Sequence, residues 1–356
     1  MQRGTRYRRV TTPIDYKNRY ENIDLQLENG GPVTVQVNKY RLAGNHVPSD
    51  AAVNAAARSA FLGALAKFGI DISLRIDTGG GILYVDPRID RHEEALRKHQ
   101  RDLLLTGWLP PSRPDLVLDG TGAHRETRPL GVSRLDRMGL KWDTRVNTHV
   151  LSKTQWEKLA RLVFVGKGSP EACQAVLQLA NHWSLTPHGV QAYADSAMGL
   201  DCNGFVGNYL WHGKNGHPWN ELGAGNLDLG PDAPINHGYF EHYQGKLLDS
   251  WEALDTAKMY IMMETDSNGT VINGGGADVS SAGHIAITEP DQRDPREKDQ
   301  KKTFAVKSVE ATGGHDPGLC ESWYTCKSVK HGNFTITREA MKTGHTEKTF
   351  RIAAVT

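Results

Sequence analysis

The second half of the chain carries helix-like hydrophobic spacing first and strand-like segments afterwards. Three helices are predicted by capping boxes or N-terminal prolines, at Thr154 and Glu157, Ser169 and Pro170, and Thr186 and Pro187. The first of these helices has one apolar face, formed by Trp156, Leu159, Leu162 and Val163. Such a face is typical of a helix that packs against the core of a domain.

Short strand-like segments follow these helices. Strands are predicted over residues 258–263, 284–288, 303–311, 334–337 and 349–355. Helices followed by an antiparallel sheet define an α+β architecture. The predicted fold class of the second half is therefore α+β, with the helices first and the antiparallel sheet second.

The N-terminal half predicts a separate small α/β unit. It contains in order a strand, an alanine-rich helix, a hairpin around glycines and a second helix, at residues 33–37, 51–68, 72–85 and 90–105. Ser49 and Asp50 cap the first helix, and Gly69 ends it. This half resembles no family that we recognise, and its role stays open.

A proline- and glycine-rich stretch after residue 107 marks a domain boundary. The chain has 356 residues and is too long for one simple core, so two domains are expected. We predict a small α/β domain with a basic N-terminal arm over residues 1–110, a linker over 111–133 and a second domain over 134–356.

Charge is nearly balanced, with 42 Lys and Arg against 41 Asp and Glu and a net charge of +1. This balance argues against nucleic acid as the main partner, and the basic arm is interpreted as a solvated tail. No apolar run approaches the ~20 residues of a membrane span, and the N-terminus lacks the apolar core of a signal peptide. We expect a protein that is cytoplasmic as synthesised, unless another route exports it or lysis releases it.

The cysteines and histidines do not predict a metal site. The chain has four cysteines, Cys173, Cys202, Cys320 and Cys326. The last two are spaced too far apart for a zinc knuckle or redox motif, and they are interpreted as reduced thiols or an incidental bridge. The histidines that lie close together also lack a recognised ligand spacing, at His212, His217, His237 and His242. No metal or other cofactor is expected.

The segment Gly199-Leu-Asp-Cys-Asn-Gly-Phe-Val206 places a cysteine where a glycine-marked turn leads into a helix. The backbone N–H groups and the positive dipole end of a helix favour a thiolate, which is the nucleophilic form of cysteine. We therefore predict that Cys202 has a low pKa. Further along, Ser281-Ala-Gly-His-Ile-Ala-Ile-Thr288 places His284 at the start of a strand. A cysteine followed by such a histidine is the minimum required for acyl transfer through a thiol.

These two segments resemble the NlpC-type cell-wall peptidases of the papain-like superfamily. The family patterns are Asp-Cys-Ser-Gly-Phe/Leu-Val and His-Val-Gly/Ala-Ile, and here they read Asp201-Cys-Asn-Gly-Phe-Val206 and His284-Ile-Ala-Ile287. The resemblance covers the C-terminal half only. It implies a papain-like fold with Cys202 as the nucleophile and His284 as the base. Asn203 replaces the usual serine at a position that helps to line the substrate pocket.

The resemblance also implies supporting residues around the nucleophile. An upstream tyrosine, for which Tyr193 is the candidate, would join the backbone N–H of Cys202 in an oxyanion hole. The helical spacing of Tyr193 with apolar neighbours fits a core position as well. Asp201 would help to hold the amine of the substrate.

A papain-like site needs a third polar group to fix the imidazole tautomer, and the family takes it from the strand after the histidine. If residues 285–288 and 306–311 form an antiparallel pair, the start of one strand lies beside the end of the other. Glu310 would then neighbour His284 and orient it. His315, which follows the strand, is the alternative third residue.

The resemblance implies a cysteine hydrolase that cleaves an amide bond in peptidoglycan stem peptides, as an endopeptidase or amidase. Its partner is then a peptide or peptidoglycan substrate, and an exported toxin would also have an immunity or secretion partner. Two alternatives stay open. One is an acyltransferase, deamidase or protease that acts on a protein target as a toxin or effector. The other is an inactive binding module of the same fold.

Overall fold

The computed structural model describes residues 11–27, 31–41, 48–72, 74–77, 82–85, 153–216, 236–255, 257–272, 283–290, 304–313, 318–339 and 347–355. Its contacts divide the chain into two compact units, Met1–Gly63 with Glu157–Thr356, and Ala64–Trp156. The sequence instead predicted domains over 1–110 and 134–356. The predicted linker over 111–133 lies outside the described residues.

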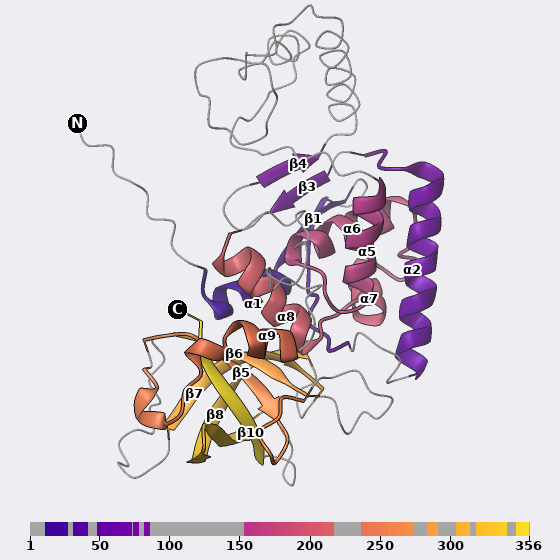
Figure 1. The fold of residues 1–356 in the computed structure, drawn as a ribbon. Helices are drawn as coiled ribbons and strands as arrows, with labels where there is room; N and C mark the ends of the chain where they lie inside the picture. Colours follow the sequence, from indigo (N-terminus) through magenta and orange to yellow (C-terminus); the bar gives the residue numbers. More distant parts are fainter. Residues whose placement is uncertain are drawn as a thin grey trace, which may run out of the picture. The chain divides into compact units, whose positions relative to one another are not determined.

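The C-terminal part of the larger unit is a closed barrel of six antiparallel strands, drawn in orange to yellow in Figure 1. The strands are β5 (Tyr260–Thr265), β6 (Ile285–Thr288), β7 (Phe304–Thr312), β8 (Gly318–Lys330), β9 (Asn333–Arg338) and β10 (Glu347–Ala354). Around the barrel their order is β10, β5, β6, β7, β8 and β9. Closure pairs every strand on both sides, so no strand edge stays open.

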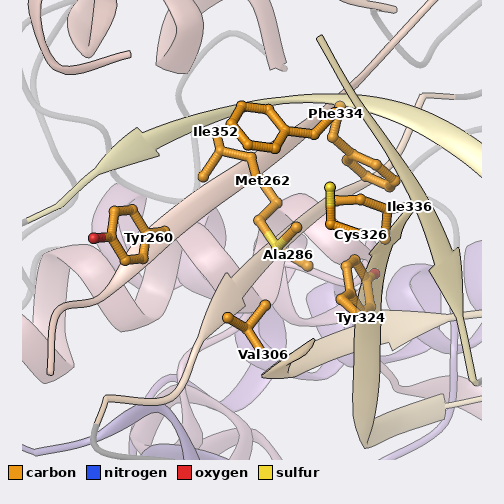
Figure 2. Close-up of a cluster of buried hydrophobic side chains, with 10 residues drawn as sticks. Tyr260, Met262, Ala286, Val306, Tyr324, Cys326, Phe334, Ile336 and Ile352 are labelled. Carbon is orange, nitrogen blue, oxygen red and sulfur yellow. The ribbon is translucent and has the colours of Figure 1, made fainter. Parts of the chain in front are cut away.

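Apolar side chains fill the barrel, and Figure 2 shows them converging. They are Tyr260, Met262, Ala286, Val306, Tyr324, Cys326, Phe334, Ile336, Phe350 and Ile352. Successive side chains of a strand point to opposite faces, so every second residue reaches this core. In β9 the buried positions are Phe334, Ile336 and Arg338. The inward face of β9 therefore ends in a charged residue.

The sequence pattern predicts five of the six strands and misses β8. The buried face of β8 includes Ser322, Tyr324 and Cys326. These residues are less apolar than the branched aliphatic residues that mark a strand most clearly. The hydrophobic alternation of β8 is therefore weak in the sequence, although its burial alternates.

Helices precede the barrel in the chain. They are α5 (Lys153–Phe164), α6 (Pro170–His182), α7 (Val190–Ala197), α8 (Cys202–Asn208) with a π-helical turn (Tyr209–Lys214), and α9 (Asn236–His242). Ser169 caps α6 by accepting the N–H of Ala172 at 3.2 Å. α8 packs against β6 and β7, and α9 packs against β5. The predicted α+β class, with helices before an antiparallel sheet, is confirmed.

The N-terminal segment up to Gly63 falls in the larger unit. It consists of α1 (Pro13–Glu21) and an antiparallel pair, β1 (Ile23–Leu27) and β2 (Gly31–Val35). The rings of Tyr16 and Tyr20 are fully buried, with centroids 6.2 and 6.3 Å from that of Phe205 in α8. This segment therefore completes the core around the helix that begins with Cys202.

Two residues of the predicted basic tail form ion pairs within this unit. Lys17 Nζ lies 2.6 Å from the Glu21 carboxylate. Arg19 Nη2 lies 2.6 Å from Oε1 of Glu171 in α6, which is a buried residue. The prediction of a solvated tail is therefore wrong for these two residues, because α1 places them against acidic partners.

In the smaller unit, β3 (Leu74–Asp77) pairs antiparallel with β4 (Ile82–Val85), as expected for the two strands of the predicted hairpin. The predicted turn at residues 78–81 lies outside the described residues. The predicted alanine-rich helix is also confirmed as α2 (Pro48–Phe68). Gly69 ends it with φ +68°, a left-handed conformation that favours glycine. The helix predicted over residues 90–105 lies outside the described residues. Of the helices that the structure describes, none is both long and apolar enough to cross a membrane.

Candidate active site

Cys202 is the first residue of α8, as the turn-into-helix pattern predicts. Asp201 caps the helix: its backbone is extended, and its carboxylate accepts the N–H of Gly204. A side chain at Gly204 would collide with the carbonyl oxygen of Gly166. The glycine of the motif therefore allows α8 to approach the preceding backbone closely.

The N-terminal segment fixes the turn that leads to Cys202. The N–H of Leu200 donates to the carbonyl oxygen of Lys39 at 2.8 Å, and the N–H of Arg41 donates to the carbonyl oxygen of Leu200 at 2.9 Å. A Cβ at Gly199 would lie 2.5 Å from the same Lys39 oxygen. Residues 39–41 are thus part of the site, although the sequence placed them in another domain.

His284 directly precedes β6, and Glu310 lies in β7. The strands pair antiparallel with Ile287 opposite Val309, which confirms the predicted strand pairing. This pairing brings Oε2 of Glu310 to 2.5 Å from Nε2 of His284. His284 is 7% exposed and Glu310 is fully buried. The alternative third residue, His315, lies outside the described residues.

Two further residues complete this polar cluster. The hydroxyl of Tyr324 donates to Oε2 of Glu310 at 2.6 Å and lies 3.1 Å from Nε2 of His284. Nη2 of Arg338 donates to the same Oε2 and, at 3.2 Å, to the hydroxyl of Thr312. Arg338 is 3% exposed, so its charge is neutralised inside the protein by Glu310.

Sequence reasoning missed Tyr324 and Arg338. The one local signal is the position of Arg338, because it continues the alternation of Phe334 and Ile336 on the buried face of β9. A charged residue in such a position is expected to have a buried partner of opposite charge. Glu310 is that partner, but only the pairing of β7 with β8 and of β8 with β9 brings the two together.

The charges of the cluster act on both members of the His284–Glu310 pair. Burial raises the pKa of Glu310, but the charge of Arg338, followed by that of His284, outweighs burial and holds this pKa at about 2. Burial lowers the pKa of His284, and Arg338 lowers it further, against the opposing effect of Glu310. At neutral pH the pair is therefore an ionised carboxylate beside a neutral imidazole.

The low pKa predicted for Cys202 is wrong in this structure. Burial raises the pKa of the Cys202 thiol to about 12, and the charge of Asp201 contributes in the same direction. Backbone hydrogen bonds from Ile285 and Asn203, and the charge of Arg338, lower it only in part. The bond from Ile285 also shows that the sulfur lies at the start of β6, one residue from His284.

The structure does not bring Tyr193 to the cysteine. Its ring lies 6.5 Å from that of Phe164 in an edge arrangement, and its buried hydroxyl has no hydrogen-bond partner in the described part of the chain. Two other tyrosines lie within electrostatic range of Cys202 instead, since its charge raises the pKa of both Tyr40 and Tyr239, after the larger effect of burial. These contacts support the alternative interpretation of Tyr193 as a core residue.

Tyr40 connects the cysteine loop to the barrel. It pairs with Leu200 in an isolated β-bridge, and a Cβ at Gly313, just after β7, would lie 3.0 Å from its ring. Tyr239 is fully buried on α9. Tyr40 is only half-buried, so of these two tyrosines it is the one that is partly exposed.

Asn203 and Asp201 differ in the hydrogen bonds that their side chains make. The carboxylate of Asp201 is used as a helix cap. The side chain of Asn203 is 3% exposed, and neither its oxygen nor its nitrogen has a hydrogen-bond partner among the described residues. An unsatisfied buried amide is costly, by about 1–3 kcal/mol per group. No contact among the described residues explains why an asparagine stands at this position.

All four cysteines are free thiols, so Cys320 and Cys326 are not bridged. In the ranges that the structure describes, no group of three or more His, Cys, Asp or Glu side chains is arranged to hold a metal ion. The chemistry that these residues offer is that of a thiol, an imidazole and a carboxylate.

Comparisons of the chain with protein-family models, with curated proteins and with solved structures give no match.

Proposed function

We propose that this protein is a cysteine hydrolase that cleaves an amide bond, with Cys202 as the nucleophile and His284 as the base. The observation that carries the proposal is the contact of 2.5 Å between Nε2 of His284 and Oε2 of Glu310. The Cys202 thiol is hydrogen-bonded to the backbone of Ile285, the residue that follows this histidine. Such a cysteine, histidine and carboxylate are the parts of a nucleophilic triad. The helices followed by an antiparallel barrel agree with a papain-like, NlpC-type domain.

The position of the proton on His284 follows from the same contact. Glu310 is ionised and can only accept, so Nε2 carries the hydrogen of the neutral imidazole. Nδ1 is then the basic nitrogen. A carboxylate in this position also stabilises the imidazolium that forms during attack.

The proposed reaction has two steps. Nδ1 of His284 takes the thiol proton of Cys202 while the sulfur attacks the amide carbon, and the imidazolium then gives this proton to the departing amine. A thioester remains. Water, deprotonated by His284, attacks the thioester carbon, and the proton returns to the sulfur as the acid leaves. No other reactant is needed.

The backbone N–H of Cys202 is the first proposed donor to the oxyanion, and we assign the second to Tyr40 in place of Tyr193. Replacing Tyr40 by Phe is expected to lower kcat roughly a hundred- to a thousandfold, as for loss of one oxyanion donor. Tyr193→Phe is the matched control and should leave kcat unchanged. Steady-state kinetics on one amide substrate test both, and a larger loss for Tyr193→Phe would return the role to that residue.

The proposed substrate is a peptidoglycan stem peptide, and the support for it is the resemblance of the segments around Cys202 and His284 to cell-wall peptidases. Cleavage by an endopeptidase or by an amidase would release different fragments. The experiment is mass spectrometry of purified peptidoglycan after incubation with the wild type, with Cys202→Ala and with Cys173→Ala. Cys173 is a buried thiol of α6 and supplies the control for loss of a sulfur.

New peptide fragments with the wild type and Cys173→Ala, and none with Cys202→Ala, would support the proposal and identify the bond. Equal release by Cys202→Ala would exclude Cys202 as the nucleophile. If the wild type leaves peptidoglycan intact but forms a Cys202-dependent adduct with a protein substrate, the enzyme acts on proteins instead. Circular dichroism of each variant verifies that the fold is retained.

A further inference from the structure

Charged or titratable side chains from the strands around His284 act on it. They are Glu264 of β5 with its partner Lys348 of β10, Glu310 of β7, Tyr324 of β8 and Arg338 of β9. From α8, Cys202 reaches the backbone of the next residue, Ile285. Lys348 lies 2.8 Å from Glu264, so this second carboxylate has a cation of its own. Beyond the effect of burial, the charge state of His284 therefore depends mainly on the balance between Glu310 and Arg338.

One carboxylate oxygen receives all the donors of the cluster. Oε2 of Glu310 accepts from Tyr324 and Arg338 and contacts Nε2 of His284, whereas Oε1 has no partner among the described residues. An oxygen shared in this way cannot change its bond to His284 without also changing its bond to Arg338. The position of the Arg338 guanidinium thus sets the position of Oε2, the oxygen that His284 contacts.

Arg338 is itself held firmly. Its Nη2 also donates to Thr312, and its guanidinium lies 5.5 Å from the centre of the Tyr324 ring. That ring packs at a tilt against the ring of Phe350 in the apolar core of the barrel, with centroids 5.7 Å apart. The barrel core therefore holds in place Tyr324 and Arg338, the two residues that donate to Oε2 of Glu310.

We propose that Arg338 is a positioning residue that acts through Glu310, fixing the proton of His284 on Nε2 and keeping this histidine neutral at rest. The inference rests on the proposed function, because it concerns the residue assigned there as the base. A neutral His284 beside a neutral thiol means that the proton moves during attack on the substrate. The resting site then holds no preformed thiolate–imidazolium pair.

The sign of the effect follows from the charges. A cation beside an imidazole disfavours its protonated form, and an anion favours it. Removal of Arg338 leaves Glu310 as the dominant charge, so the pKa of His284 should rise. Since the base must be neutral, the acid limb of kcat/KM should move to higher pH in the same variant.

The direct test is the NMR titration of His284 in the full-length protein, with its signal assigned from a His284→Gln variant. In the wild type at pH 7, ¹⁵N shifts should show a neutral ring with hydrogen on Nε2, and His284 should stay neutral below the ordinary histidine pKa of about 6.5. Arg338→Met should raise the pKa of His284, whereas Arg338→Lys should raise it less because it keeps the charge. Arg351→Met, which removes an arginine from β10, is the matched control and should not change it.

A charged His284 in the wild type at pH 7, or hydrogen on Nδ1, would overturn the proposal without any variant. An unchanged pKa in Arg338→Met, or an equal rise in Arg351→Met, would overturn it as well. Alkylation gives a second criterion: at pH 5.5, iodoacetamide should not modify Cys202 ahead of the other cysteines, and rapid selective modification there would reveal an ion pair at rest. None of these measurements uses a substrate, so they separate failure of this inference from failure of the proposed hydrolase activity.

Discussion

Deleting residues 1–41 is expected to unfold the larger unit, including the barrel. The deleted segment contributes a set of apolar side chains that are at most 3% exposed, Tyr16, Tyr20, Ile23, Leu25, Val35 and Val37. Burial of each such side chain contributes about 1.5–3 kcal/mol. Their sum, on the order of 10 kcal/mol, is comparable to the whole free energy of unfolding of a typical protein, about 5–15 kcal/mol.

The deletion also removes polar partners from buried groups that stay behind. Glu171 is 3% exposed and would lose Arg19, and Glu289 would lose the N–H of Ile14, which it accepts at 2.9 Å. A buried charge without its partner costs about 3–5 kcal/mol. This cost adds to the loss of apolar contacts, so the expected result is an unfolded chain.

Far-UV circular dichroism and thermal unfolding of a chain that begins at residue 42 test this prediction. A chain that begins at residue 11 is the matched control, because it keeps the described contacts of α1. Cooperative unfolding of the shorter chain at the temperature of the full-length protein would show that the N-terminal segment is separable, as the sequence predicted.

The resemblance indicated that the third polar group lies on the strand after His284, and the pattern of the two strands then placed Glu310 beside this histidine, with His315 as the alternative. The strands that carry His284 and Glu310 are close in the chain and strongly hydrophobic, and an antiparallel arrangement of two such strands brings the end of one beside the start of the other. The start of α8 at Cys202 is equally local, because Asp201 and Gly204 define the turn within the motif itself.

The remaining parts of the site depend on contacts between distant segments. Tyr40 reaches the cysteine loop through backbone bonds to Leu200, and Arg338 reaches Glu310 only because the barrel places β9 two strands from β7. No local pattern specifies such contacts. The pKa of Cys202 was predicted with the wrong sign for a related reason: a helix start can be recognised in a sequence, but the degree of burial that outweighs it cannot.

Glu310→Gln is expected to lower both turnover and stability. Glutamine can still contact His284 but does not stabilise an imidazolium, so turnover should fall roughly ten- to a thousandfold, in line with general acid–base contributions. Stability should fall as well, because Arg338 is buried and would lose the carboxylate with which it forms an ion pair. Loss of one partner of a buried ion pair costs about 3–5 kcal/mol.

A double-mutant cycle separates the two effects. Arg338→Met alone should also destabilise, because Glu310 is then a buried carboxylate without its arginine. The double variant, Glu310→Gln with Arg338→Met, contains neither charge and should be more stable than the sum of the single losses predicts. Chemical denaturation of the four proteins measures this coupling, and additive losses would show that Arg338 and Glu310 do not depend on each other.

The pH dependence provides an independent criterion for the same substitution. The pKa of Glu310 is about 2 in the folded protein, against an ordinary value of 4.5, so its ionised form stabilises the fold above pH 4.5. This contribution is lost as pH falls from 4.5 towards 2, because the carboxyl is then protonated and resembles the amide. The stability difference between wild type and Glu310→Gln should therefore shrink over this range.

His315→Ala tests the alternative third residue, and it should change neither stability nor turnover by an amount comparable to the effect of Glu310→Gln. If His315→Ala were the slower enzyme and Glu310→Gln retained full activity, the orienting role would pass to His315, and the buried Glu310–Arg338 pair would be structural.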